Sequence, residues 1–118
     1  MKSGIWQAEK NLNQVLLIPQ DAERYVEPFC HGTMSLGMYA PYRQDQQEPH
    51  DQDELYFVLS GSGVFISDGE KSEIKTGDAI FVAAGEEHRF EDFTDDFATW
   101  VVFWGAKGGE HEENKFEA

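Results

Sequence analysis

The sequence contains little that would support a disulfide, a membrane anchor or a nucleic-acid interface. Its one cysteine, Cys30, cannot form an internal disulfide, and we expect it to be a small buried apolar residue. No apolar run approaches the length of a spanning helix, and no signal peptide is visible, so the cytoplasm is the expected compartment. Only nine lysines and arginines stand against 23 acidic residues, a net charge of −14. Because phosphate binding needs a basic surface, we expect no nucleic-acid partner and no binding to anionic membranes.

Several motifs of common enzyme classes are also missing. The chain has no Gly-x-Ser-x-Gly nucleophile motif, no phosphate loop, no dinucleotide fingerprint and no Cys-x-x-Cys zinc pattern. Hydride transfer and nucleotide hydrolysis are therefore poor hypotheses.

The length and the aromatic content indicate one domain with a substantial core. The chain has 118 residues, among them nine Phe, four Tyr and three Trp. Rings of this kind fill barrel interiors and subunit interfaces. We expect an N-terminal arm over residues 1–14, one domain over residues 15–104, and a flexible acidic tail over residues 105–118.

Short apolar runs separated by turn signals predict an all-β domain. Asp68-Gly69 is a strong signal for a tight hairpin turn. No segment has a convincing helical stripe, apart from a single turn expected at residues 20–24. A jelly roll of antiparallel strands satisfies this pattern. The strands are expected at residues 15–18, 29–39, 48–59, 64–67, 71–75, 79–83 and 97–104.

One expected strand concentrates the residues that could bind a metal. Side chains on a strand alternate between its two faces, so Glu48, His50, Gln52 and Glu54 share one face if the chain is extended from residue 48. Nitrogen and oxygen ligands of this kind suit divalent Fe, Mn, Ni, Zn or Co. Such a strand needs a second histidine from a facing strand, and His88 is the candidate.

The two segments resemble the two motifs of the cupin superfamily. The first motif has Gly, five residues, His-x-His, three or four residues, Glu, six residues and Gly; the second has Gly, five residues, Pro-x-Gly, two residues, His, three residues and Asn. The matching positions of the first motif are His50, Glu54 and Gly61, and those of the second are Gly77, Gly85 and His88.

The sequence also departs from these motifs. Tyr42 stands at the opening glycine of the first motif and Glu48 at its first histidine, while Ala83 replaces the proline of the second and Asp92 its asparagine. The fourth ligand position is therefore open between Glu48, Gln52 and water. Asp92 could orient His88 or face solvent.

The resemblance covers roughly residues 30 to 104 and implies a jelly-roll barrel with a divalent metal, Fe, Mn, Ni or Zn. The implied ligands are His50, Glu54 and His88, with Glu48 as a possible fourth. Tyr56 shares a face with Glu54, and we take both as candidate catalytic residues. Asp51 and Asp53 point the other way and are expected to be solvated or bonded to a loop.

Two functions follow from the resemblance. One is a small metal-dependent enzyme of the dioxygenase, isomerase or lyase type, acting on a small polar or aromatic molecule. The other is a non-catalytic module that holds a sugar or a carboxylate. Because residues 97–104 are apolar on both faces, we also expect a homodimer.

Overall fold

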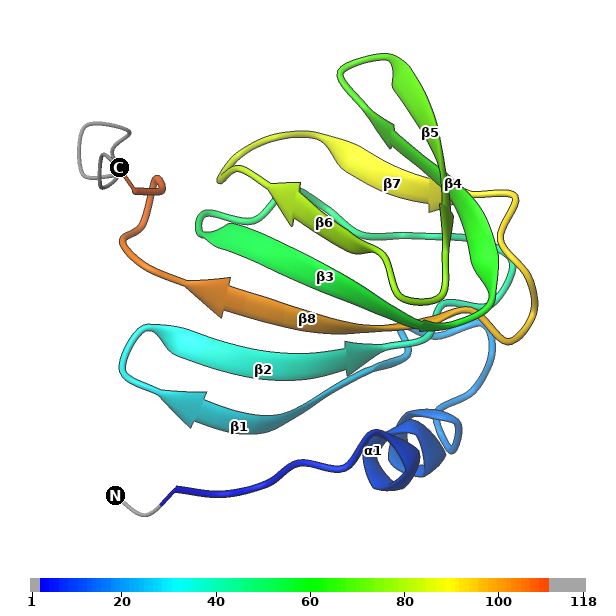
Figure 1. Ribbon diagram of the computed structural model, residues 1–118, viewed down its shortest axis with the longest axis horizontal. Helices are drawn as coiled ribbons and strands as arrows, with labels where there is room; N and C mark the ends of the chain where they lie inside the picture. The colour runs from blue at the N-terminus through cyan, green and yellow to red at the C-terminus, as the bar shows by residue number, and fades with distance from the viewer. Residues whose placement is uncertain (1–2, 111–118) are drawn as a thin grey trace.

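The protein folds into two antiparallel sheets with one short helix. The computed structural model describes residues 3–110, and no helix within them is long and apolar enough to cross a membrane. The five-stranded sheet has the order β1-β2-β8-β3-β6 and the three-stranded sheet the order β5-β4-β7 (Figure 1). The elements are α1 (Ala8–Val15), β1 (Tyr25–His31), β2 (Met34–Tyr39), β3 (Asp53–Ser60), β4 (Ser62–Ser67), β5 (Glu70–Lys75), β6 (Ala79–Val82), β7 (His88–Glu91) and β8 (Ala98–Trp104).

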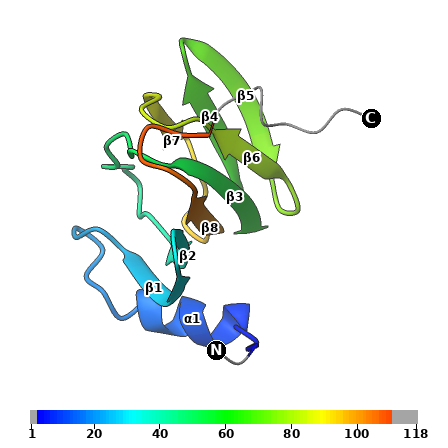
Figure 2. The same cartoon turned by 90° about the vertical axis from the view of Figure 1, so that its left-hand side faces the viewer.

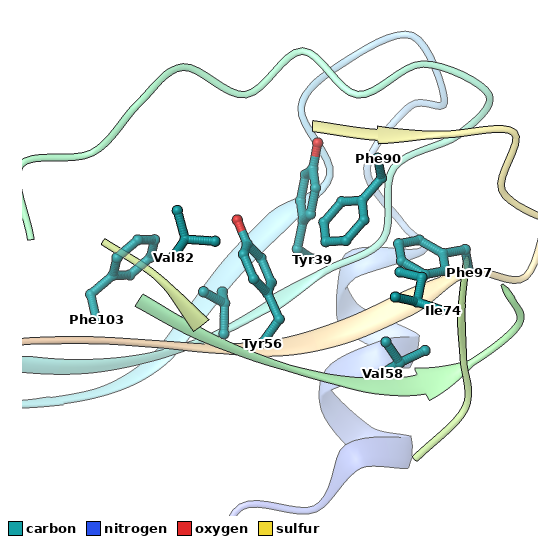
Figure 3. Close-up of a cluster of buried hydrophobic side chains, with 9 residues drawn as sticks. Tyr39, Tyr56, Val58, Ile74, Val82, Phe90, Phe97 and Phe103 are labelled. Carbon is teal, nitrogen blue, oxygen red and sulfur yellow. The ribbon is translucent and has the colours of Figure 1, made fainter. Parts of the chain in front are cut away.

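The main core lies between the two sheets. Buried side chains from β2, β3, β6 and β8 meet side chains from β4, β5 and β7 (Figure 3). Tyr56, Phe90 and Phe97 are the largest of the side chains that are almost fully buried. The all-β jelly-roll prediction is confirmed, although strand pairing does not close the two sheets into a continuous barrel within residues 3–110.

The N-terminal region differs from the prediction. Residues 8–15 form α1, and no strand forms at residues 15–18. Ala8, Leu12 and Val15 follow the i, i+4, i+7 spacing of one helix face. This face packs on the outer side of the five-stranded sheet, against Met38 and Ala98 (Figure 2). The sequence therefore does contain an apolar helix face, but this face consists of only three residues.

The expected strand over residues 29–39 is in fact the hairpin of β1 and β2. Gly32, with φ 58°, lies in the turn between them. Cys30 lies near this turn, opposite Ser35, and its side chain is exposed. The prediction of a buried Cys30 was wrong, because the end of the hairpin extends beyond the core.

Strand β3 begins at Asp53 and not at Glu48. Residues 40–52 form an irregular segment, in which Pro49 has no N–H to contribute to a strand ladder. The prediction that Glu48, His50, Gln52 and Glu54 share a strand face was therefore wrong.

Four of the five later strands agree with the prediction to within two residues, and the fifth, β7, was not predicted. β4, β5, β6 and β8 occupy the segments that were expected as strands. Asp68 and Gly69 have φ values of 50° and 77°, the left-handed conformation that a two-residue hairpin turn requires.

Candidate functional site

Three of the predicted site residues meet in the interior. Glu54 and Tyr56 are two residues apart on β3 and point inward, and His88 is the first residue of β7. The Glu54 carboxylate is 2.9 Å from His88 Nε2, and the side chains of this pair are 1% and 0% exposed. The Tyr56 hydroxyl is 3.0 Å from His88 Nε2 and 3.3 Å from the Glu54 carboxylate. The two sheets thus join a carboxylate, an imidazole and a phenol in one buried cluster.

Two residues of the irregular segment complete this cluster, and sequence reasoning missed both. Asp45 accepts hydrogen bonds from the Tyr39 hydroxyl at 2.6 Å, from the Phe90 N–H at 2.8 Å, and from the backbone and side-chain nitrogens of Gln47 at 3.0 and 3.1 Å. Gln47 in turn accepts a hydrogen bond of 2.7 Å from the Tyr56 hydroxyl. Both phenols point to the same side, where this segment lies (Figure 3).

The chemistry of these side chains shows which groups donate and which accept in this network. A carboxylate only accepts, so the amide nitrogen of Gln47 faces Asp45 and its oxygen faces Tyr56. Tyr56 has one proton to donate, and the shorter of its two donor contacts runs to the Gln47 oxygen at 2.7 Å, while the Glu54 carboxylate lies at 3.3 Å. His88 Nδ1 lies 3.0 Å from the carbonyl of Glu86, to which it donates. Both ring nitrogens of His88 therefore face an acceptor oxygen, Nε2 that of the Glu54 carboxylate and Nδ1 that of the Glu86 carbonyl.

The pKa shifts reflect these contacts. Burial of the His88 ring lowers its pKa, but the hydrogen bonds to Glu54 and to the Glu86 carbonyl, with the charges of Glu54 and Asp45, outweigh burial and raise the pKa. Burial, followed by the charges of Glu54 and Asp45, raises the pKa of Tyr56 well above its ordinary value. Tyr56 is therefore a neutral phenol at neutral pH.

The other two proposed ligands lie outside this cluster. Glu48 and His50 are exposed. The His50 ring packs on Phe103, with 4.4 Å between ring centroids, and Phe103 pairs directly with Glu54 across β8 and β3. Gln52 donates to the carbonyls of residues 33 and 105, at 2.8 and 3.1 Å, and so ties two turns together. Within residues 3–110, no three histidine, cysteine, aspartate or glutamate side chains converge as a metal-binding group.

The acidic residues beside the site have structural contacts. Asp53 is buried, and its two oxygens accept hydrogen bonds of 3.0 Å from the N–H groups of Ala84 and Glu110. Asp51 is exposed and lies 3.6 Å from Lys107. Both residues were expected to be solvated or bonded to a loop, and the structure places Asp51 at the surface and bonds Asp53 to two loop N–H groups. Asp92 is exposed at φ 50° and makes no hydrogen bond to His88.

The comparison with known families decides the classification. The family model described as Cupin domain matches residues 35–104 of this chain. This chain is a cupin. The match covers more than half of the chain and includes all the residues of the buried cluster.

The relatives of this cupin have diverse descriptions. An uncharacterised protein of Streptomyces coelicolor is 36% identical over 81 residues, which cover 67% of this chain and 77% of that protein. An oxalate-binding protein of Thermotoga maritima is 44% identical over 39 residues, covering 33% of this chain and 32% of the relative. The structure of the DMSP lyase DddQ from Ruegeria pomeroyi superposes with a TM-score of 0.60 at 21% identity, covering 69% of this chain and 46% of that one. This last likeness establishes the fold alone.

Two residues of this cupin fit the divalent metal that the family resemblance implies. The hydrogen bond from Nδ1 to the Glu86 carbonyl holds the His88 ring with Nε2 toward Glu54, the arrangement common in metal-binding histidines. An imidazole nitrogen and a carboxylate oxygen are ligand types that such metals accept. A complete ligand set with His50 and Glu48 stays a prediction.

A solvent-open pocket of about 790 Å³ lies next to the buried cluster. It is bordered on one side by the irregular segment and on the other by the start of β7 and the β4–β5 turn. The chain therefore has room for a small molecule beside the cluster. The lining residues are Asp45, Gln47, Glu48, Pro49, Ile66, Asp68, Gly69, Glu86, Glu87, His88 and Arg89.

Proposed function

We propose that this cupin is a small-molecule enzyme that uses a divalent metal, Fe, Mn, Ni or Zn, held by Glu54 and His88. The observation that supports this most directly is the buried 2.9 Å pair, in which a backbone carbonyl fixes the imidazole. His50 and Glu48 are the proposed further ligands. Both belong to an irregular segment outside the strand ladders and have exposed side chains, and binding the metal would require these side chains to turn toward the pair.

Each residue of the cluster has a proposed role. When bound, the metal would polarise an oxygen of the substrate or lower the pKa of a bound water. Glu54 is the group that accepts or returns a proton. Tyr56, which stays a neutral phenol, donates a hydrogen bond to a substrate oxygen. The reaction class is that of a dioxygenase, isomerase or lyase.

The first test is metal content by elemental analysis of the untagged protein. We expect near-stoichiometric Fe, Mn, Ni or Zn in the native chain and none in His88→Ala, because this change removes a ligand from the buried pair. His31→Ala is the matched control, since His31 is exposed and far from the cluster in the chain. No metal in the native protein, and none taken up on reconstitution, would contradict the proposal.

A second function is favoured by the oxalate-binding relative. The chain would then be a non-catalytic module that holds a carboxylate or a sugar, with the metal as a clamp. Oxygen uptake and turnover of a compound panel, with Fe(II) or Mn(II) supplied, distinguish the two functions. An enzyme converts a compound of the panel, whereas a binding module gives ligand-induced thermal shifts without turnover.

We also propose a homodimer through the outer face of the five-stranded sheet. Phe81, Leu55, Val102 and Leu36 pair in a row across β6, β3, β8 and β2, and no charged side chain interrupts this row. Phe81 is 58% exposed, and neighbouring Phe57 is 40% exposed. In a chain with a net charge of −14, an uncharged face of this kind is where two copies can approach.

Sedimentation tests the dimer. We expect twice the chain mass at micromolar concentration and the monomer mass for Phe81→Glu. Ile5→Glu is the control, because Ile5 is exposed but lies outside this row. A native chain that sediments only as a monomer would contradict the dimer.

A further inference from the structure

We propose that Gln47, oriented by Asp45, positions Tyr56 and closes the Glu54–His88 pair, so that a ligand reaches the pair by displacing the Gln47 side chain. This inference rests on the proposed function of the same cluster. It assigns a role to two residues that lie outside the proposed ligand set.

The pair is sealed from solvent in this structure. The side chains of His88 and Glu54 are 0% and 1% exposed, and Tyr56 is 0% exposed. The adjoining pocket is nevertheless bordered by His88 and by Gln47. Gln47 thus borders the pocket while its side-chain oxygen is hydrogen-bonded to Tyr56 of the buried cluster.

Asp45 and Gln47 are held in different ways. Asp45 accepts from Tyr39 on β2 and from the Phe90 N–H on β7, so it is bonded to both sheets. The Gln47 side chain has two hydrogen bonds, one to Asp45 and one to Tyr56. Asp45 thus provides a fixed anchor, and Gln47 can leave Tyr56 without any change in the strands.

Displacement of Gln47 changes what Tyr56 can do. In the closed arrangement the Tyr56 proton is donated to the Gln47 oxygen. Once Gln47 leaves, the same proton is available to an oxygen of an incoming molecule. The ligand class that fits is a small polar molecule with an acceptor oxygen, such as a carboxylate, a carbonyl or a hydroxyl.

The test is the rate at which diethyl pyrocarbonate modifies His88 in the metal-free protein, measured at a pH above the raised pKa of His88, where the ring is neutral, and read by peptide mass spectrometry. In the native chain we expect His88 to react far more slowly than exposed His31 and His50, which serve as internal references. In Gln47→Ala we expect the His88 rate to rise at least tenfold. Gln46→Ala, at the exposed neighbouring position, should leave the rate unchanged.

A stability control separates local opening from general loosening. Val58→Ala creates a core cavity on β3 that does not touch Gln47. An unchanged His88 rate in Gln47→Ala, or an equal rise in Val58→Ala, would overturn the proposal. Because the measurement needs neither metal nor substrate, its outcome is independent of the metal analysis that tests the proposed function.

Discussion

Strand β3 and the irregular segment that precedes it hold the candidate site residues in opposite settings. Glu54 and Tyr56 on β3 are buried between two sheets and fixed by strand pairing on both sides. Glu48 and His50 on the irregular segment are exposed and lie outside any strand ladder. The strand therefore holds its site residues by ladder pairing and burial, whereas the segment is held by single hydrogen bonds, such as that from the Gly85 N–H to the His50 carbonyl, and leaves the side chains of Glu48 and His50 exposed.

This difference affects how charge is stabilised. The Glu54–His88 ion pair is desolvated, so each partner depends on the other for compensation. Glu48 is solvated and needs no partner. Substitutions on β3 and on the irregular segment should therefore differ strongly in how much they reduce the stability of the metal-free protein. They should differ less in how much they reduce its metal affinity.

The largest expected effect is on the stability of Glu54→Ala. Removing one partner of a buried ion pair leaves an uncompensated charge and typically costs about 3–5 kcal/mol. Glu48→Ala is the matched control, and a surface change of this kind should stay within about 0.5 kcal/mol. Urea denaturation of the metal-free proteins measures both. Equal losses at the two positions would contradict the assignment of Glu54 to a buried ion pair.

A smaller effect is expected for His50→Ala, and only when metal is present. We predict a roughly 10- to 100-fold loss of metal affinity, in the range seen for altered metal sites, with little change in metal-free stability. Chelator competition measures the affinity. If His50 serves only to pack on Phe103, affinity will be unchanged and stability will fall instead.

The smallest effect is a pH dependence of stability in the metal-free protein. The raised pKa of His88 means that the folded protein binds a proton more tightly than the unfolded chain. The stabilisation is fully present below the pKa of His88 in the unfolded chain, about 6.5, and is lost as pH rises through its pKa in the folded protein. Denaturation from pH 6 to 9 should show this fall in the native chain and in His31→Ala. The same fall in His88→Gln would assign the pH dependence to another group.

The contrast between the two regions also explains what could be predicted from the sequence. From residue 62 onward, turn signals such as Asp68-Gly69 delimit short strands, and local patterns predicted β4, β5, β6 and β8 but missed β7. Glu54 and Tyr56 were placed on one face because both lie within a paired strand. The same rule of alternation failed at His50, since Pro49 precedes it and the ladder begins only at Asp53.

The remaining features depend on contacts that are distant in sequence. Asp45 and Phe90 are 45 residues apart, and no local pattern indicates that one accepts a hydrogen bond from the other. The stripe of α1 rests on three apolar residues within eight, and its burial depends on Met38 in a later strand. Both were missed because tertiary packing, and not local periodicity, defines them.

The contact between Asp53 and Glu110 has a consequence for the order in which the chain matures. The two residues are 57 positions apart, and the hydrogen bond between them fixes the start of β3 directly beside Glu54. Gly109, at φ 94°, passes close to the Asp53 carboxylate, where a larger residue would be strained. During synthesis from the N-terminus, the Asp53 carboxylate therefore gains this hydrogen bond only after residue 110 has been made, and replacing residues 105–110 would remove it.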